Sequence, residues 1–139
     1  MPNAFIAGTG FYVPPKIITN DELSQYINTT DKWIRDRTGI QTRHFVEKGV
    51  GPSDLAIPAT KKALDSAGLS VDDIDFIIFA TSTPDYYIPG SGCLLQEKMG
   101  FREIGALDIR VQCSGFIYGL SIAEQYIKTG TFNNILLVG

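Results

Sequence analysis

The sequence predicts an α/β fold in which a mainly parallel, buried β-sheet carries helices on both faces. Two observations lead to this prediction. Short, continuous apolar runs, typical of strands buried on both faces, alternate along the chain with amphipathic segments. Of the 139 residues, 44% are hydrophobic and 19% are charged, a balance typical of a chain that forms a globular core.

The alternation predicts βαβ units. The expected elements are, in order, a strand at 4–13, short helices at 20–27 and 31–38, a helix at 53–67, a strand at 74–81, a helix at 90–99, a strand at 104–111, a helix at 115–128 and a strand at 135–138. The run 74–81 is the clearest buried strand because it is almost entirely apolar.

Residues that favour helix ends set the limits of these helices. Thr19 and Glu22 have the spacing of a capping box. Thr30 and the pair Ser53-Asp54 can cap the next two helices. A glycine follows four of the helices, because glycine most easily adopts the left-handed conformation that ends a helix. These glycines are Gly39, Gly68, Gly100 and Gly130.

Charge and hydropathy exclude several classes of protein. Twelve Lys and Arg against fifteen Asp and Glu give a net charge of −3, without the basic excess of a nucleic-acid-binding protein. No apolar stretch approaches the ~20 residues that span a bilayer, and the N-terminus lacks the pattern of a secretory signal. We therefore expect a cytoplasmic protein with no nucleic-acid or membrane partner.

Metal and dinucleotide sites are also excluded. Cys93, Cys113 and the single histidine, His44, lack the spacing of zinc ligands. Gly8-Thr9-Gly10 follows an apolar run, as in dinucleotide-binding proteins, but Pro14-Pro15 prevents the helix that would receive the pyrophosphate. A tight turn is the expected role of these glycines.

Cys113 is the candidate nucleophile. It stands where the expected strand 104–111 gives way to the helix 115–128, so its thiol would lie at the positive end of the helix macrodipole. Both the dipole and the free backbone N–H groups favour the thiolate, and the same groups can stabilise a developing oxyanion. The alternative is that Cys113 is a small buried side chain.

The remaining candidates are weaker. Cys93 falls inside a predicted helix, where an inert core thiol is expected, and His44 lies in a polar stretch and is expected to be structural. Trp33 and Arg37 are four residues apart and share a helix face. They can stack on a base and pair with a phosphate, as coenzyme A would require, or they can form a cation–π pair on the surface.

Several segments together resemble β-ketoacyl-acyl carrier protein synthase III, the initiating condensing enzyme of bacterial fatty-acid synthesis. The most specific segment is Asp-x-Trp-Ile-x-x-Arg-Thr-Gly-Ile at 31–40. The other matching segments are 6–10, 29–30, 43–44, 80–81, 113–116 and 136–139. The resemblance covers essentially the whole chain and implies a thiolase-like fold. We expect residues 1–139 to be its N-terminal half-domain, truncated after the strand 135–138, with the C-terminal half absent.

The resemblance also implies roles. Cys113 matches the cysteine that takes the acyl primer from coenzyme A. Trp33 matches the ring that lies beside the adenine, and Arg37 and Thr29 match residues near the nucleotide part of coenzyme A. Acyl-CoA is then a substrate and no cofactor is permanently bound. The implied partners are acyl carrier protein, which brings the malonyl group, and a second copy of the chain. The catalytic His and Asn of the family belong to the absent half.

Two departures from the family leave alternatives open. Val111-Gln112 stands before the cysteine where many members have small residues. Ile88 stands where an aromatic residue is common, in a loop that closes the partner's acyl pocket across the dimer interface in the family. A specialised thiolase-fold acyltransferase or condensing enzyme, and a non-catalytic subunit that binds acyl-CoA, are therefore the alternatives.

Overall fold

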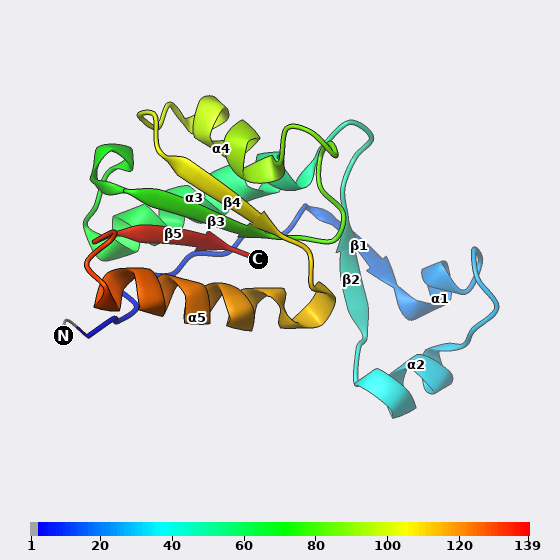
Figure 1. Cartoon of the computed structure of the whole chain (residues 1–139). Coiled ribbons are helices and arrows are strands. Elements are labelled where there is room, and N and C mark those ends of the chain that lie inside the picture. Colours follow the sequence, from blue (N-terminus) through cyan, green and yellow to red (C-terminus); the bar gives the residue numbers. More distant parts are fainter. Residues whose placement is uncertain (1–2) are drawn as a thin grey trace. The chain divides into compact units, whose positions relative to one another are not determined.

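The structure, a computed structural model, describes residues 3–139 (Figure 1). The chain forms two compact units. One unit contains the residues up to Tyr12 together with Gly51–Gly139, and the other contains Val13–Val50. No helix among the described residues is long and apolar enough to cross a membrane.

The larger unit is built on a parallel sheet of three strands in the order β4-β3-β5 (Figure 1). The strands are β3 (Phe76–Ala80), β4 (Gly105–Ile109) and β5 (Ile135–Val138). Each lies within one of the apolar runs at 74–81, 104–111 and 135–138, so these three strand predictions are confirmed. The register places Ile78 between Leu107 and Leu137.

Helices cover both faces of this sheet (Figure 1). They are α3 (Pro52–Ala67), α4 (Ser91–Met99) and α5 (Gly115–Lys128), with short 3₁₀ turns at Val71–Asp73 and Gln112–Ser114. Successive side chains of a strand point to opposite faces. Ile77 and Phe79 pack into one core with Ala56 and Leu95, from α3 and α4.

The other face of β3 meets α5. A Cβ atom on Gly119 would lie 2.4 Å from Leu137 Cδ1 and 3.5 Å from Ile78 Cγ2, so this glycine lets α5 approach the sheet closely. Ile77 and Ile78 are both fully buried, although they point to opposite faces. The predicted α/β fold, with a parallel sheet buried between helices, is confirmed.

The strand expected at 4–13 does not form. Residues 3–10 instead line an apolar hollow of about 620 Å³ together with α3, α5 and β5. Gly8 and Gly10 approach α3 so closely that a Cβ atom on either would lie within 2.5 Å of a backbone oxygen. The apolar pattern predicted an extended segment, but a strand also needs a neighbour that accepts its hydrogen bonds. The pattern does not supply that neighbour.

The smaller unit contains two antiparallel strands that the sequence did not predict, β1 (Lys16–Thr19) and β2 (Thr42–Phe45). Its helices are α1 (Asn20–Leu23) and α2 (Asp31–Thr38). The capping box at Thr19 and Glu22 is confirmed, and so are Thr30 as N-cap and Gly39, with φ 73°, as C-cap. The α1 helix is shorter than the expected 20–27.

A single buried side chain joins the elements of this unit. Asn20 is 1% exposed, and its Nδ2 donates to Asp31 Oδ1 and to the Ile40 carbonyl oxygen, each at 2.8 Å. Its Oδ1 accepts a hydrogen bond from Arg43. Because every polar atom of the amide has a partner, its burial costs little and fixes α1 against α2 and β2.

The cap of α3 differs from the prediction. Gly51, and not Ser53, is the N-cap, and the Asp54 carboxylate accepts from the Gly51 N–H at 2.9 Å. Ser53 lies in the first turn, fully buried, and its hydroxyl donates to Asp85. The long-range partner of Ser53, which sequence spacing does not reveal, explains the difference.

Asp75 joins β3 to the segment before β5. Its Oδ2 accepts from the backbone N–H of Asn134 at 3.0 Å and of Asn133 at 2.9 Å, and its Oδ1 accepts from Arg102 at 2.8 Å. These hydrogen bonds hold the pKa of Asp75 below its ordinary value of 3.8, against the opposing effect of burial. The charged carboxylate therefore stabilises the fold.

We predict that Asp75→Asn lowers the free energy of unfolding by about 1–3 kcal/mol at pH 7, because charge-assisted hydrogen bonds are lost. The lowered pKa means that the carboxylate contributes its stability above about pH 4 and loses it as the pH falls further. The difference from the parent chain should therefore shrink towards pH 3 in urea denaturation. The exposed Asp65→Asn is the control, and an equal difference at both pH values would contradict the prediction.

Candidate active site

Cys113 lies in the single 3₁₀ turn, Gln112–Ser114, that links β4 to α5. Its side chain is exposed. The expected junction of strand and helix is therefore present, and the alternative of a buried, inert thiol is not supported by the structure. The buried Gly115 begins α5 against the end of β3, where a Cβ atom would lie 3.1 Å from Ala80 Cβ.

The residue before the cysteine has an unusual backbone. Within residues 3–139, Gln112 is the one non-glycine residue with a positive φ, 53°. The left-handed region costs a residue with a Cβ atom about 1–2 kcal/mol, and such strain is concentrated at functional sites. The chain turns sharply here, and the turn resembles a nucleophile elbow with sulfur in place of oxygen.

The N-terminus of α5 differs electrostatically from those of α3 and α4. The Asp85 carboxylate accepts from the first turn of α3, and the Asp108 carboxylate accepts from the N–H groups of Ser91 and Gly92 in α4. No side chain among the described residues caps α5 in this way. The positive end of the α5 dipole is therefore left for Cys113 and for a negatively charged group bound beside it.

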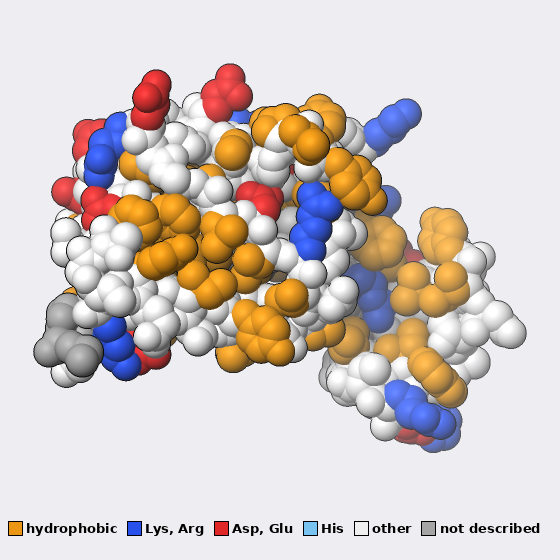
Figure 2. All heavy atoms as spheres, in the orientation of Figure 1, with side chains coloured by type: hydrophobic (Ala, Val, Ile, Leu, Met, Phe, Trp, Pro, Cys, Tyr) orange, Lys and Arg blue, Asp and Glu red, His pale blue; other side chains and the backbone are white. Residues whose placement is uncertain are grey.

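Exposed apolar side chains continue from Cys113 along the first turn of α5. Phe116, Ile117 and Tyr118 are 45%, 63% and 54% exposed. Figure 2 shows hydrophobic side chains gathered on the face that carries β5 and α5. Three consecutive large apolar side chains on a helix surface indicate a contact with an apolar ligand or with another part of a protein.

The residues expected to hold coenzyme A lie in the smaller unit. Trp33 is 56% exposed on α2, and the Arg37 guanidinium carbon lies 5.6 Å from its ring centroid. Thr29 precedes the helix, and its buried Oγ1 has no hydrogen-bond partner among the described residues. The structure thus brings Trp33 and Arg37 together on one exposed face. Cys113 and Ile88 belong to the other unit.

His44 lies on β2 in the smaller unit, and its Nδ1 forms a hydrogen bond with the carbonyl oxygen of Pro14. This contact gives the ring a structural role within its unit, as expected from the sequence. No group of three or more His, Cys, Asp or Glu side chains in residues 3–139 is placed to hold a metal ion.

The prediction that Cys93 is a core thiol is wrong. Cys93 is exposed, because the buried positions of α4 are Ser91, Gly92 and Leu95. It lines a shallow hollow with Tyr87, Ile88, Gly90, Ala106, Asp108 and Arg110. Ile88 itself is 90% exposed at the tip of the loop before α4.

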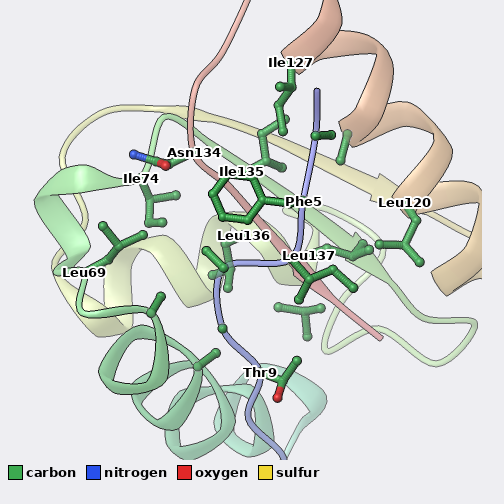
Figure 3. Close-up of a pocket in the computed structure, with 18 of the residues that line it drawn as sticks. Phe5, Thr9, Leu69, Ile74, Leu120, Ile127, Asn134, Ile135, Leu136 and Leu137 are labelled. Carbon is green, nitrogen blue, oxygen red and sulfur yellow. The ribbon is translucent and has the colours of Figure 1, made fainter. Parts of the chain in front are cut away.

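The apolar hollow between residues 3–10 and β5 does not include Cys113 (Figure 3). The ring of Phe5 points into it, opposite Ile135 and Leu136 of β5 (Figure 3). We therefore do not assign the chemistry of Cys113 to this hollow.

The comparisons with known proteins agree with these features. A family model described as 3-oxoacyl-[acyl-carrier-protein (ACP)] synthase III matches residues 107–139, which include Cys113 and α5. The chain is 46% identical over 134 residues to the β-ketoacyl-[acyl-carrier-protein] synthase III of Xanthomonas campestris pv. campestris strain 8004. That match covers 96% of this chain and 41% of the relative.

Solved structures give the same result. The 3-oxoacyl-[acyl-carrier-protein] synthase III of Aquifex aeolicus VF5 matches with a TM-score of 0.89 and 41% identity, over 95% of this chain and 42% of that one. The priming β-ketosynthase of the R1128 polyketide pathway matches with a TM-score of 0.89 and 28% identity, over 97% of this chain and 41% of that one. The chain is therefore similar, over nearly its whole length, to about two fifths of a β-ketoacyl-[acyl-carrier-protein] synthase III, and the resemblance to this family is confirmed.

Proposed function

We propose that these residues supply the nucleophile of an initiating condensing enzyme of fatty-acid synthesis, in a protein longer than the present 139 residues. The observation that carries the proposal is the position of Cys113, which is exposed, follows a strained residue and lies at the N-terminus of α5, where no side chain of residues 3–139 forms a cap. The similarity to β-ketoacyl-[acyl-carrier-protein] synthase III proteins supports it.

The reaction proceeds in two transfers. The Cys113 thiolate attacks the thioester carbonyl of acyl-CoA, the coenzyme A thiolate leaves and takes up a proton, and the acyl group remains on sulfur. Backbone N–H groups at the start of α5 stabilise the oxyanion of this step. Malonyl-acyl carrier protein then loses CO₂, and its carbanion attacks the acyl-cysteine to give a 3-ketoacyl product and free Cys113. The family's His and Asn would serve this second step from outside residues 1–139.

Trp33, Arg37 and Thr29 are proposed to bind coenzyme A as a substrate, with no permanently bound cofactor. The exposed indole offers a face for the adenine, and the guanidinium beside it offers hydrogen bonds to a phosphate. Within the described residues, the ion pairs of α2 involve Lys32 and Arg35, and not Arg37. Thr29 has a buried hydroxyl without a partner in the described residues.

Acyl carrier protein and a second copy of the chain are the proposed partners. Tyr86, Tyr87 and Ile88 are 63%, 85% and 90% exposed, so the loop tip presents apolar side chains that suit the acyl pocket of a partner subunit. Ile88 is proposed to contact the acyl chain there. The cytoplasmic location expected from the sequence stays a prediction.

A second candidate function is a specialised condensing reaction. Val111 and the strained Gln112 stand directly before the nucleophile, and a priming β-ketosynthase of a polyketide pathway shares the fold. Acceptor profiles would separate the two functions, because the fatty-acid enzyme should prefer malonyl-acyl carrier protein to other thioesters. A non-catalytic subunit would bind acyl-CoA without forming an acyl-cysteine.

We predict that Cys113→Ala abolishes self-acylation of the full-length protein by acyl-CoA, because the acylated sulfur is lost. Cys93→Ala is a matched control, since Cys93 is also exposed. It should retain acylation. Mass spectrometry of peptides after incubation with acetyl-CoA locates the acyl group. Acylation of Cys113→Ala would contradict the proposal.

We also predict that Trp33→Ala raises the KM for acyl-CoA by about fivefold, because stacking of this kind contributes about 1 kcal/mol. The kcat should change little, because Trp33 binds the nucleotide equally in the ground state and the transition state. The exposed Lys32→Ala, on the same helix, is the control. An unchanged KM with a reduced kcat would argue against this role.

A further inference from the structure

The loop 81–90 carries exposed apolar side chains at its tip but is tightly held at its base. Tyr87 and Ile88 are among the most exposed large apolar side chains of the described residues. Loop tips of this kind usually have many conformations. A loop that closes an acyl pocket must instead keep one, because a misplaced wall changes the length of chain that the pocket accepts.

Asp85 supplies the fixed point at the base. Its carboxylate accepts from the Ser53 hydroxyl at 2.8 Å and from the Ser53 N–H at 3.2 Å, in the first turn of α3. Its own N–H donates to Ser91 Oγ at 3.1 Å, at the start of α4. Ser53 and Ser91 are both fully buried. One loop residue is thus bound to two helices through two side chains that have no access to water.

Gly51, Ser53 and Lys98 surround the Asp85 carboxylate or its hydrogen-bond partner. A Cβ atom on Gly51 would lie 2.0 Å from Asp85 Oδ1, so only glycine leaves room for the acid at this N-cap. Lys98 donates to Ser53 Oγ at 2.7 Å, so the serine hydroxyl both donates and accepts. The positive end of the α3 dipole adds to the attraction. Asp85 therefore lies in a network whose members all have partners.

A second contact holds the tip. Arg110 Nη2 donates to the Tyr87 carbonyl oxygen at 3.4 Å, and its guanidinium carbon lies 5.0 Å from the centroid of the Tyr87 ring. Arg110 follows β4 directly and stands three residues before Cys113. The loop is therefore bound at its base to two helices and at its tip to the segment that carries the nucleophile.

We propose that Asp85 is a positioning residue that keeps the 81–90 loop in one conformation and thereby helps to set which acyl chains the enzyme accepts. This inference rests on the proposed function, since the acyl chain matters only if Cys113 is acylated. Asp85 does not touch the reacting atoms and acts through the tip residues, Tyr87 and Ile88.

The first test is amide hydrogen exchange. In Asp85→Ala, exchange of the loop 81–90 should become at least about tenfold faster, because local opening no longer breaks the two hydrogen bonds between the carboxylate and Ser53. Asp54→Ala is the matched control. It removes a carboxylate that also binds the start of α3 but does not bind the loop, so loop exchange should stay within about twofold of the parent. Unchanged loop exchange in Asp85→Ala would overturn the proposal.

The second test is the acyl-chain preference of the full-length protein. The ratio of kcat/KM for acetyl-CoA and octanoyl-CoA should change at least about threefold in Asp85→Ala and not in Asp54→Ala. A faster-exchanging loop with an unchanged ratio would overturn the role in selectivity. Failure of the parent to acylate Cys113 would instead reject the proposed function, while the exchange experiment would still report on the loop anchor.

A milder variant covers the case in which Asp85→Ala does not fold. Ser53→Ala removes the hydroxyl bond to Asp85, and the bond from Lys98, but keeps the carboxylate and its bond from the Ser53 N–H. Exchange of the loop should therefore increase by a smaller factor, and the preference should shift in the same direction. If Ser53→Ala changes neither loop exchange nor preference, the anchoring role is rejected.

Discussion

The larger unit depends on the burial of β3 from both sides. Ile77 and Ile78 are fully buried on opposite faces, and each such side chain contributes about 1.5–3 kcal/mol of stability relative to an exposed one.

Because β3 is central and its neighbours are parallel, the three strands end at the same edge of the sheet. The register pairs Ala80 with Ile109 and Phe79 with Val138. The loop 81–90 and the turn at Cys113 therefore begin on neighbouring strands, which explains how Arg110, just after β4, reaches Tyr87 in the loop.

The helix N-termini of the larger unit differ in whether a carboxylate side chain is bound to their first N–H groups. In α3 and α4 the first amides are bonded to Asp85 and Asp108, side chains that arrive from a loop and a strand. These carboxylates act as permanent anions at the positive helix ends and fix the fold. The start of α5 has no such side chain among the described residues, so its amides can serve a charge that forms only during a reaction.

Much of this architecture could be predicted from the sequence. The buried strand at 74–81 and the helix at 115–128 follow from local patterns of apolar residues, and so does the position of Cys113 between a strand and a helix. Its role as nucleophile stays a prediction. The errors share one cause, which is dependence on distant partners. The strand at 4–13 lacked a bonding neighbour, and β1 and β2 are stabilised by each other and not by a strong pattern of their own.

Side-chain partners escaped prediction for the same reason. Ser53 was expected to cap α3, but Asp85 binds it from a loop 32 residues away in the chain. The exposure of Cys93 depends on which face of α4 meets the sheet, and a short helix with few apolar positions leaves that choice open. The φ of Gln112 has no signal in the sequence, because glutamine does not favour the left-handed region.

The outer edge of β5 has a consequence for the behaviour of the chain in solution. Within the described residues β5 is an edge strand, and beside it the side chains of Phe5 and Ile6 are 82% and 67% exposed. An apolar edge with unpaired backbone groups is a template on which other strands can assemble. At high protein concentration these 139 residues by themselves should self-associate through this edge, and added salts that strengthen apolar association should promote the process.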